Sequence, residues 1–358
     1  MLKNGVRSEV SPYLIEIDGS QKSGSGTILR LAVALAAILG QPLHIHGIRQ
    51  NRPQPGLKPQ HLEAVLTAAK LCGAKLEGAR LDSRELWFEP NRIRGGNIEA
   101  EIGTAGSIPM LLMTVLPICA FAENTVRLHV SKGGTDVSHS PTINYIQHVF
   151  LPTLKRMGLN ASLTVHKYGY YPKGIGEVTV SVEPCKSLKP LRLEDSGNIQ
   201  AVRGISVCTF LAERKVAERQ AKAANDYLKE KGYVTDIRAV NDSSNPLQKG
   251  SSLVLWAETD TGAIVGADAI GELKKASETV GREAAEKLYT ELSAKSTADV
   301  HLADMLIPYL ALAQGKSAYL TRKLTDHLET NIWLVQEMLN TKINAQKVNG
   351  LYRVEKVG

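Results

Sequence analysis

Two arginines in the segment IRQNRPQPGLKPQHL have the spacing expected of a phosphate-binding loop. Arg49 and Arg52 lie three residues apart, and two guanidinium groups at this spacing can each form forked hydrogen bonds to phosphate oxygens. Three prolines and a glycine stiffen the segment and delay the next helix, whose first turn should contain Gln60 and His61. Free N–H groups at that helix start would also attract an anion. The segment predicts an anion site, and a solvated basic loop is the alternative.

Histidines occupy the first turns of two predicted helices, at His61 and His327. The positive end of the helix dipole disfavours an imidazolium ion, so a ring at this position stays neutral and can act as a nucleophile. Thr325 or Asp326 is the expected N-cap before His327. An ordinary polar position at a helix start is the alternative interpretation for either histidine.

A third predicted helix, HLADMLIPYLALA, is apolar almost throughout but contains His301 and Asp304. These two side chains lie three residues apart and therefore on one face of the helix. A carboxylate in so apolar a helix needs a partner or a ligand, although an aspartate in an exposed first turn is an alternative. The Gly-rich segment IDGSQKSGSGTILR matches neither a Walker A motif nor a complete dinucleotide-binding motif, so neither site is expected.

The elements that would position these residues recur three times in the order helix, strand, loop, helix, strand. The copies cover residues 27–76, 104–166 and 299–348, and Gly73 and Gly158 are expected to cap matching helix ends. Residues 185–276 follow another pattern of strands and one charged helix, which indicates an inserted smaller α/β domain. We therefore expect an α/β (α+β) fold in which residues 1–184 and 277–358 form a large three-repeat domain.

Composition narrows the possible partners and location. The formal net charge of +7 favours acidic partners such as nucleotides or RNA. The four cysteines form neither a C-x-x-C pair nor a dense disulfide pattern, which favours a reducing, cytoplasmic location. The apolar runs 28–39 and 108–122 are too short to cross a bilayer, and no signal peptide is recognised, so no membrane association is expected.

Seven segments, in order along almost the whole chain, resemble the RNA 3'-terminal phosphate cyclase family. They are DGS with GSGTILR, IRQNRPQPGLKPQHL, IGTAGS, GGTDV with SP, YYPKGIGEV, HLAD with PYLALA, and HLETN. The resemblance implies three repeated α/β units with an inserted small domain. It also implies an enzyme that uses ATP to convert an RNA 3'-phosphate into a 2',3'-cyclic phosphate through a covalent enzyme–AMP, releasing pyrophosphate and AMP.

The resemblance also implies roles for individual residues. His327 is the expected nucleophile that accepts AMP. Arg49, Arg52 and Gln60 are expected to bind phosphate oxygens of ATP or of the RNA end. The expected nucleotide-binding residues are Arg30, Met113, Pro141, His301, Leu302, Ala303, Asp304 and Met305, with His301 stacking on the base in place of an aromatic residue and Pro141 covering its opposite face.

Three positions depart from the family pattern. Ser23 stands where the family has a glutamate associated with the metal, and Met113 and Met305 stand where glutamines are common. A serine hydroxyl lacks the charge of a carboxylate, so the ligands of the expected Mg²⁺ or Mn²⁺ are unknown. Either the phosphates of ATP hold the metal, or the activity is altered or lost.

Two other functions stay open at this level. A catalytically silent cyclase-like protein would keep the fold as an RNA-processing or ribosome-assembly partner, although the presence of His327 favours an active enzyme. A small-molecule transferase is the third alternative, because enolpyruvyl transferases use a related repeated unit. The paired arginines and HLETN fit nucleotidyl transfer better. The sequence specifies neither the RNA substrates nor the oligomeric state.

Overall fold

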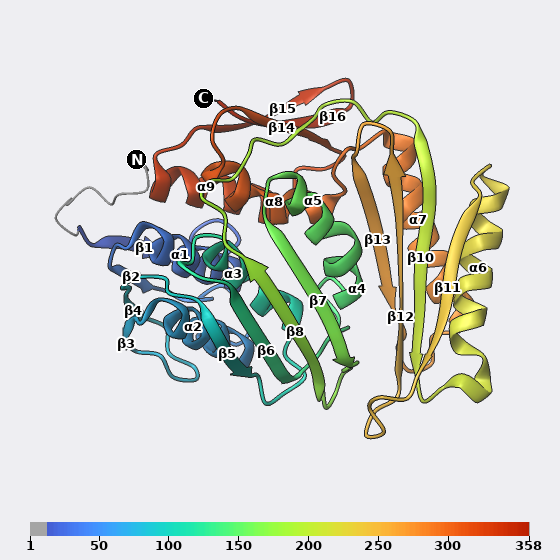
Figure 1. Ribbon diagram of the computed structural model, residues 1–358, viewed down its shortest axis with the longest axis horizontal. Coiled ribbons are helices and arrows are strands. Elements are labelled where there is room, and N and C mark those ends of the chain that lie inside the picture. The colour runs from blue at the N-terminus through green and yellow to red at the C-terminus, as the bar shows by residue number, and fades with distance from the viewer. Residues whose placement is uncertain (1–12, 358) are drawn as a thin grey trace.

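Three of the four sheets in the computed structural model, which describes residues 13–357, share one strand order (Figure 1). In each, a first strand pairs parallel with the second, the second pairs antiparallel with the fourth, and the third lies at the far edge. The first sheet contains β1 (Ile15–Asp18), β2 (Leu43–His46), β4 (Leu86–Glu89) and β3 (Lys75–Glu77). The second contains β5 (Gly96–Glu101), β6 (Val126–Gly133), β8 (Gly176–Glu183) and β7 (Asn160–Lys167). The third contains β9 (Arg192–Leu193), β14 (Ser317–Thr321), β16 (Leu351–Lys356) and β15 (Ile343–Val348).

Two helical segments complete each unit, which therefore runs strand, helix, strand, helix, strand, strand. They are α1 (Gly26–Leu39) and α2 (Pro59–Cys72); α3 (Ile108–Cys119) and the run α4 (Ile143–Tyr145), π-turn Ile146–Phe150 and α5 (Leu151–Arg156); and α8 (Val300–Leu312) and α9 (Asp326–Leu339). The predicted fold class and its repeated elements are confirmed. The repeat predicted from sequence omitted the short first strand of every unit, because two to six residues give too little periodicity. It also omitted the last strand of the first and third units, β4 and β16.

Local signals explain where several helices begin and end. Ser25 caps α1 by accepting a hydrogen bond from the Thr27 N–H, and Gly40 ends it in the left-handed conformation. Gly73 ends α2 in the same way, as predicted. Gly158 also has a positive φ of 89°, but it follows the cap residue Met157 instead of forming the cap itself.

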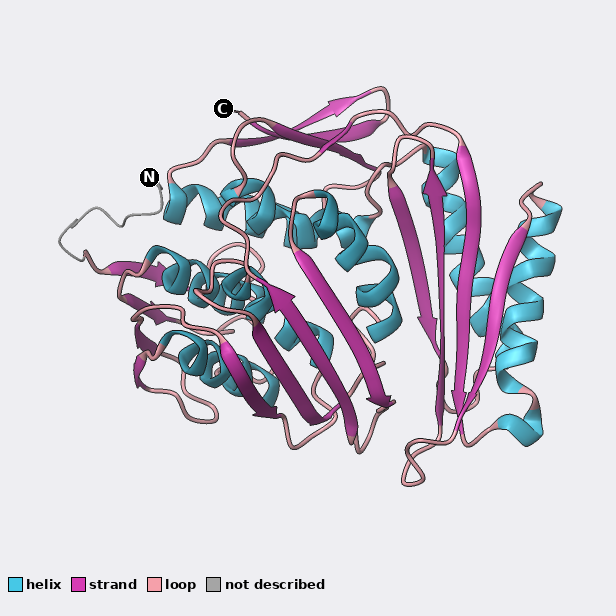
Figure 2. Cartoon of the chain, in the orientation of Figure 1, coloured by secondary structure: helices cyan, strands magenta, loops and turns pink. Residues whose placement is uncertain are grey.

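A fourth sheet forms a separate layer, at the right of Figure 1 and Figure 2. Its order is β11 (Thr235–Asp242), β10 (Ile199–Thr209), β12 (Gly250–Thr259) and β13 (Ile264–Ile270). The helices α6 (Val216–Glu230) and α7 (Ser277–Ala294) pack on this sheet and on each other, and a 3-10 turn, Ala212–Arg214, precedes α6. These contacts favour a smaller domain from β10 to α7, whereas the boundaries at residues 185 and 276 stay a prediction.

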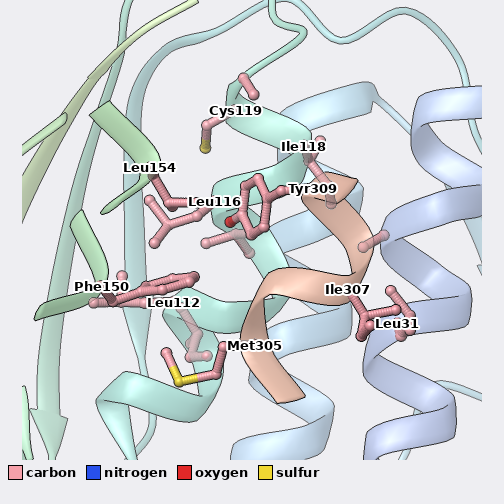
Figure 3. Close-up of a cluster of buried hydrophobic side chains, with 14 of the residues drawn as sticks. Leu31, Leu112, Leu116, Ile118, Cys119, Phe150, Leu154, Met305, Ile307 and Tyr309 are labelled. Carbon is pink, nitrogen blue, oxygen red and sulfur yellow. The ribbon is translucent and has the colours of Figure 1, made fainter. Parts of the chain in front are cut away.

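The main hydrophobic core joins the helices of all three units. Figure 3 shows part of it, where Leu112 and Leu116 of α3 and Met305 and Tyr309 of α8 lie near Phe150. Leu31 of α1 lies beside Ile307, on the other side of α8. A second core under α6 and α7 includes Leu228, Leu255 and Leu288. Within residues 13–357, no helix is both long and apolar enough to span a membrane.

A buried carboxylate joins the fourth sheet to the rest of the protein. Asp299, which is 1% exposed, caps α8 by accepting hydrogen bonds from the N–H groups of His301 and Leu302 at 3.0 and 3.1 Å. It also accepts from the Gly266 N–H of β13 at 2.9 Å and from the Tyr145 hydroxyl at 2.8 Å. One side chain therefore ties together an α8 terminus, a strand of the smaller layer and the second unit.

Replacing this side chain should destabilise the whole protein. Asp299→Ala leaves several buried donors without an acceptor, so we expect a loss of about 3 kcal/mol or more in the free energy of unfolding. Tyr145→Phe removes a single donor and should cost less. Chemical denaturation measures both, with Asp226→Ala, a change on the exposed face of α6, as the control. An Asp299→Ala midpoint equal to that of the control would contradict this role.

Candidate active site

A cavity of about 600 Å³ lies where the three units meet the smaller layer. Its wall includes α1, α3, α8 and α9, the loop 137–141, the end of β13 and part of α7. The volume is within the range of about 300–1,000 Å³ typical of small-molecule sites. Seven of the residues predicted from sequence line it: Arg30, Met113, Pro141, His301, Asp304, Met305 and His327.

His327 lies in the first turn of α9, whose N-cap Thr325 accepts a hydrogen bond from the Leu328 N–H. Its Nδ1 is 3.4 Å from the Thr27 hydroxyl, which also accepts a hydrogen bond from the Arg30 guanidinium at 3.1 Å. Desolvation, followed by the positive charges of Arg30 and Arg52, lowers the pKa of His327 below the ordinary 6.5. The ring is therefore neutral at neutral pH and has the form a nucleophile requires.

Asp304 connects α8 to the start of α9. Its carboxylate accepts a hydrogen bond from the Thr325 hydroxyl at 2.6 Å, and its backbone carbonyl accepts one from the Asn331 side chain at 2.8 Å. Burial raises the pKa of Asp304 to about 7. The buried carboxylate of Asp304 therefore has the hydrogen-bond partner that an apolar environment requires. Through Thr325 it also fixes the position of the turn that contains His327.

The remaining predicted residues of α8 divide between the cavity and the core. His301 is exposed, and its ring meets the buried Tyr145 ring edge-on at 6.5 Å. Met305 belongs to the core but also reaches the cavity wall. Leu302 and Ala303 are fully buried and do not line the cavity. Helical geometry explains this difference, because consecutive residues of one helix point in different directions and only one face can border the cavity.

The loop that carries Pro141 is fixed from two sides. The Ser140 hydroxyl lies 2.5 Å from the hydroxyl of Ser107, the N-cap of α3. On the other side of Pro141, the Thr142 N–H donates to the Asp268 carboxylate of β13 at 2.7 Å. Pro141 is thereby held in the cavity wall between the second unit and the smaller layer.

The arginine loop lies beside the cavity, and its residues are not part of the cavity wall. Arg49 has a positive φ of 54° and donates to the carbonyls of Gln54 and Gly56 at 2.7 and 2.9 Å, so it also stabilises its own loop. Arg52 is exposed. Gln60 accepts a hydrogen bond from the Ser107 N–H at 2.7 Å, which gives it a structural contact to the start of α3.

The arginines beside the cavity have no acidic partner within ion-pair distance among residues 13–357. This holds for Arg30, Arg49 and Arg52. Burial, followed by the charge of Arg49, lowers the pKa of Arg30 to about 10. Burial, followed by the charge of Arg52, also lowers the pKa of Arg49, while the charge of Asp82 acts in the opposite direction. Neighbouring cations that form no ion pair are a favourable place for an anion.

The two histidines that occupy equivalent helix starts differ in exposure. His61 is 5% exposed and lies against Gly26, where an added Cβ atom would be 2.2 Å from its Nε2. Burial, followed by the charge of Arg30, lowers its pKa to about 2. Since His61 does not line the cavity, His327 is the member of the pair that can reach a ligand there.

Sequence reasoning missed several cavity residues. Thr27, Ser138, Asp268, Lys275 and Lys287 all line the wall. Thr27 belongs to the Gly-rich segment IDGSQKSGSGTILR, and this segment could have indicated a site residue. The residues of β13 and α7 gave none, because they belong to a layer whose contact with the cavity is set by tertiary packing.

The described residues do not form a protein-only metal site. No group of three or more His, Cys, Asp or Glu side chains in residues 13–357 is arranged to hold a metal ion. Ser23 contacts the Ser25 hydroxyl at 3.0 Å, and its N–H donates to Thr330 of α9 at 3.3 Å. Its hydroxyl lies among neutral groups, so this position does not fit the role of a charged metal ligand.

Comparison with known proteins agrees with this geometry. The family model described as RNA 3'-terminal phosphate cyclase matches residues 21–345. A protein of that name from Pyrobaculum aerophilum is 42% identical over 344 residues, which cover 96% of this chain and 98% of the relative. The one from Methanosarcina acetivorans is 43% identical over 362 residues, covering 95% and 99%, and that from Methanopyrus kandleri is 43% identical over 341 residues, covering 94% and 96%. The chain belongs to the RNA 3'-terminal phosphate cyclase family.

Proposed function

We propose that this enzyme uses ATP to convert an RNA 3'-terminal phosphate into a 2',3'-cyclic phosphate through a covalent adenylate on His327. The observation that carries the proposal is the neutral His327 ring at the cavity wall, beside arginines that form no ion pair within residues 13–357. A neutral nucleophile next to uncompensated cations suits attack on a nucleotide phosphate. The cytoplasm is the proposed location.

The first step is transfer of AMP to the histidine. Nδ1 faces Thr27, whereas Nε2 has no hydrogen-bond partner among the described residues, so Nε2 is the proposed nucleophile. A bond forms between Nε2 and the α-phosphorus of ATP while the bond to pyrophosphate breaks. Arg30 is suited to bind the phosphate oxygens as charge develops on them. His301 and Pro141 border the proposed position of the base.

The RNA then replaces the histidine. An oxygen of the RNA 3'-phosphate attacks the same phosphorus, the nitrogen–phosphorus bond breaks, and an RNA–AMP anhydride results. The neighbouring 2'-hydroxyl attacks the RNA phosphorus and loses its proton to water, while the anhydride bond to AMP breaks, which closes the ring and releases AMP. Arg52 is suited to hold the RNA phosphate. A bound Mg²⁺ or Mn²⁺ would supply charge neutralisation on the phosphates, and no step here depends on a protein ligand to it.

Substitution of the nucleophile tests the proposal directly. His327→Ala should abolish transfer of acid-labile label from α-labelled ATP to the protein, because it removes the ring nitrogen that is proposed to bond to the α-phosphorus. The fold should persist, since His327 is exposed. His301→Ala is the matched control and should still accept label, with weaker ATP binding. Normal labelling of the His327 variant would refute the histidine–AMP intermediate.

The pH dependence of labelling provides a second test. Because the pKa of His327 is lowered, its ring stays neutral as the pH falls towards 6.5. The decrease of the labelling rate at acidic pH, here called the acid limb, should therefore lie below about pH 6.5. Arg52→Ala removes one of the charges that lower this pKa, so the limb should move to higher pH. Arg52→Lys keeps the charge and should keep the limb near its original position. Identical profiles for the three proteins would contradict this electrostatic account.

A further inference from the structure

We propose that an edge of the molecule next to the cavity binds the single-stranded RNA that leads to the 3'-phosphate. This inference rests on the proposed function, because it names where that substrate continues outside the cavity. The surface, the aromatic–lysine patch, consists of Tyr171, Lys173, Phe210, Lys249, Leu273 and Lys274. These residues belong to four loops, which connect β7 to β8, β10 to α6, β11 to β12 and β13 to α7.

Buried contacts hold the four loops together. Tyr170, which is 4% exposed, donates its N–H to the side-chain oxygen of Gln248 at 2.7 Å, and its hydroxyl lies 3.1 Å from that of Thr209. Its ring covers Gly250, where an added Cβ atom would be 2.2 Å away. The fourth loop joins them through the Gly271 N–H, which donates to the Ser251 carbonyl at 2.8 Å.

The patch exposes apolar side chains without a covering element. Tyr171 is 80% exposed, Phe210 41% and Leu273 98%. Phe210 also has a positive φ of 52°, a backbone conformation that is costly for a bulky residue. Exposed apolar side chains concentrated at one edge mark an interaction surface.

The charges of the patch point to a nucleic acid. Lys173, Lys249 and Lys274 are exposed, and no ion pair involves them within residues 13–357. The nearby Glu272 accepts a hydrogen bond from Ser138 at 3.4 Å, and Asp242 accepts one from Thr209 at 2.9 Å. Unpaired cations interleaved with exposed aromatic rings are the usual means of binding single-stranded nucleic acid, because the rings stack on bases and the cations follow the phosphates.

The patch borders both parts of the proposed active site. Gly174, in the loop of Tyr171, packs on the backbone of Thr104 and Ala105, where an added Cβ atom would lie 2.7 Å from the Thr104 carbonyl oxygen. The neighbouring Gly106 contacts Gln60, which follows the arginine loop. On the other side, Glu272 bonds Ser138 of the cavity wall and directly precedes Leu273. RNA bound at the arginines can therefore continue onto the patch without crossing another layer.

RNA binding by two variants tests the inference. Tyr171→Ala combined with Phe210→Ala should weaken binding of a longer 3'-phosphorylated oligonucleotide by at least about fivefold for each stacked base that is lost. The triple variant Lys173→Ala, Lys249→Ala and Lys274→Ala should reduce the slope of log affinity against log salt by about 2, since each single-strand phosphate contact contributes about 0.7. Fluorescence anisotropy across a salt series measures both effects.

Matched variants control for general effects. Trp87→Ala removes an exposed aromatic residue from the first sheet, and Lys186→Ala, Lys189→Ala and Lys316→Ala together remove the same charge elsewhere. Both controls should bind the longer RNA as the wild type does. The patch variants should also keep the wild-type rate of enzyme–AMP formation with ATP alone, and the wild-type KM for a 3'-phosphorylated dinucleotide that is too short to reach the patch.

The outcomes separate this inference from the proposed function. Wild-type binding of the longer RNA by the patch variants would overturn the inference, and so would an equal loss in the controls or a change in oligomeric state alone. A wild-type protein that forms no cyclic phosphate on either RNA would instead overturn the proposed function. The binding measurements would still decide whether the patch holds RNA.

Discussion

The buried carboxylate of Asp299 is the contact on which the arrangement of the active site depends. Burial raises the pKa of Asp299, so the ionised form is tolerated only because four donors converge on it. Those donors come from α8, β13 and the second unit. α8 then carries Asp304, which holds Thr325 at the start of α9. Asp299 therefore links the smaller layer to α8, and Asp304 links α8 to the turn that contains His327.

Electrostatics and burial together favour one of the two histidines as the proposed nucleophile. Among the residues that the structure describes, the arginines beside the cavity form no ion pair. Their mutual repulsion has an energetic cost that a bound phosphate would remove. Desolvation, followed by the charges of Arg30 and Arg52, lowers the pKa of His327 and favours the neutral ring. Burial, followed by the charges of Arg30 and Arg49, lowers the pKa of His61 further, to about 2, yet His61 is enclosed beside Gly26. A lowered pKa is therefore insufficient, and access to the cavity distinguishes the two histidines.

The sequence predicted the fold well because its signals are local. Helix periodicity, capping residues and turn glycines defined the three units, and the motif matches selected seven residues of the cavity wall. Leu302 and Ala303 were included because they belong to a matched segment, and only the packing of α8 against the core decides that they face inward. The role of Asp299 could not be predicted from the sequence either, because its hydrogen-bond donors Tyr145 and Gly266 are far away in sequence. Long-range packing, and not local propensity, determines what sequence reasoning missed.

The position of the insertion explains how the smaller layer reaches the site. In the first two units, short loops connect β1 to α1 and β5 to α3, at residues 19–25 and 102–107. Both loops contact residues of the cavity wall: Ser25 accepts a hydrogen bond from the Thr27 N–H, and the Ser107 hydroxyl lies 2.5 Å from that of Ser140. In the third unit the same connection, from β9 to α8, contains the whole fourth sheet with α6 and α7. Because the insertion replaces a loop at the edge where the site forms, its residues Asp268 and Lys275 enter the cavity wall. The cavity therefore requires all three units and the insertion, and no single repeat could form it.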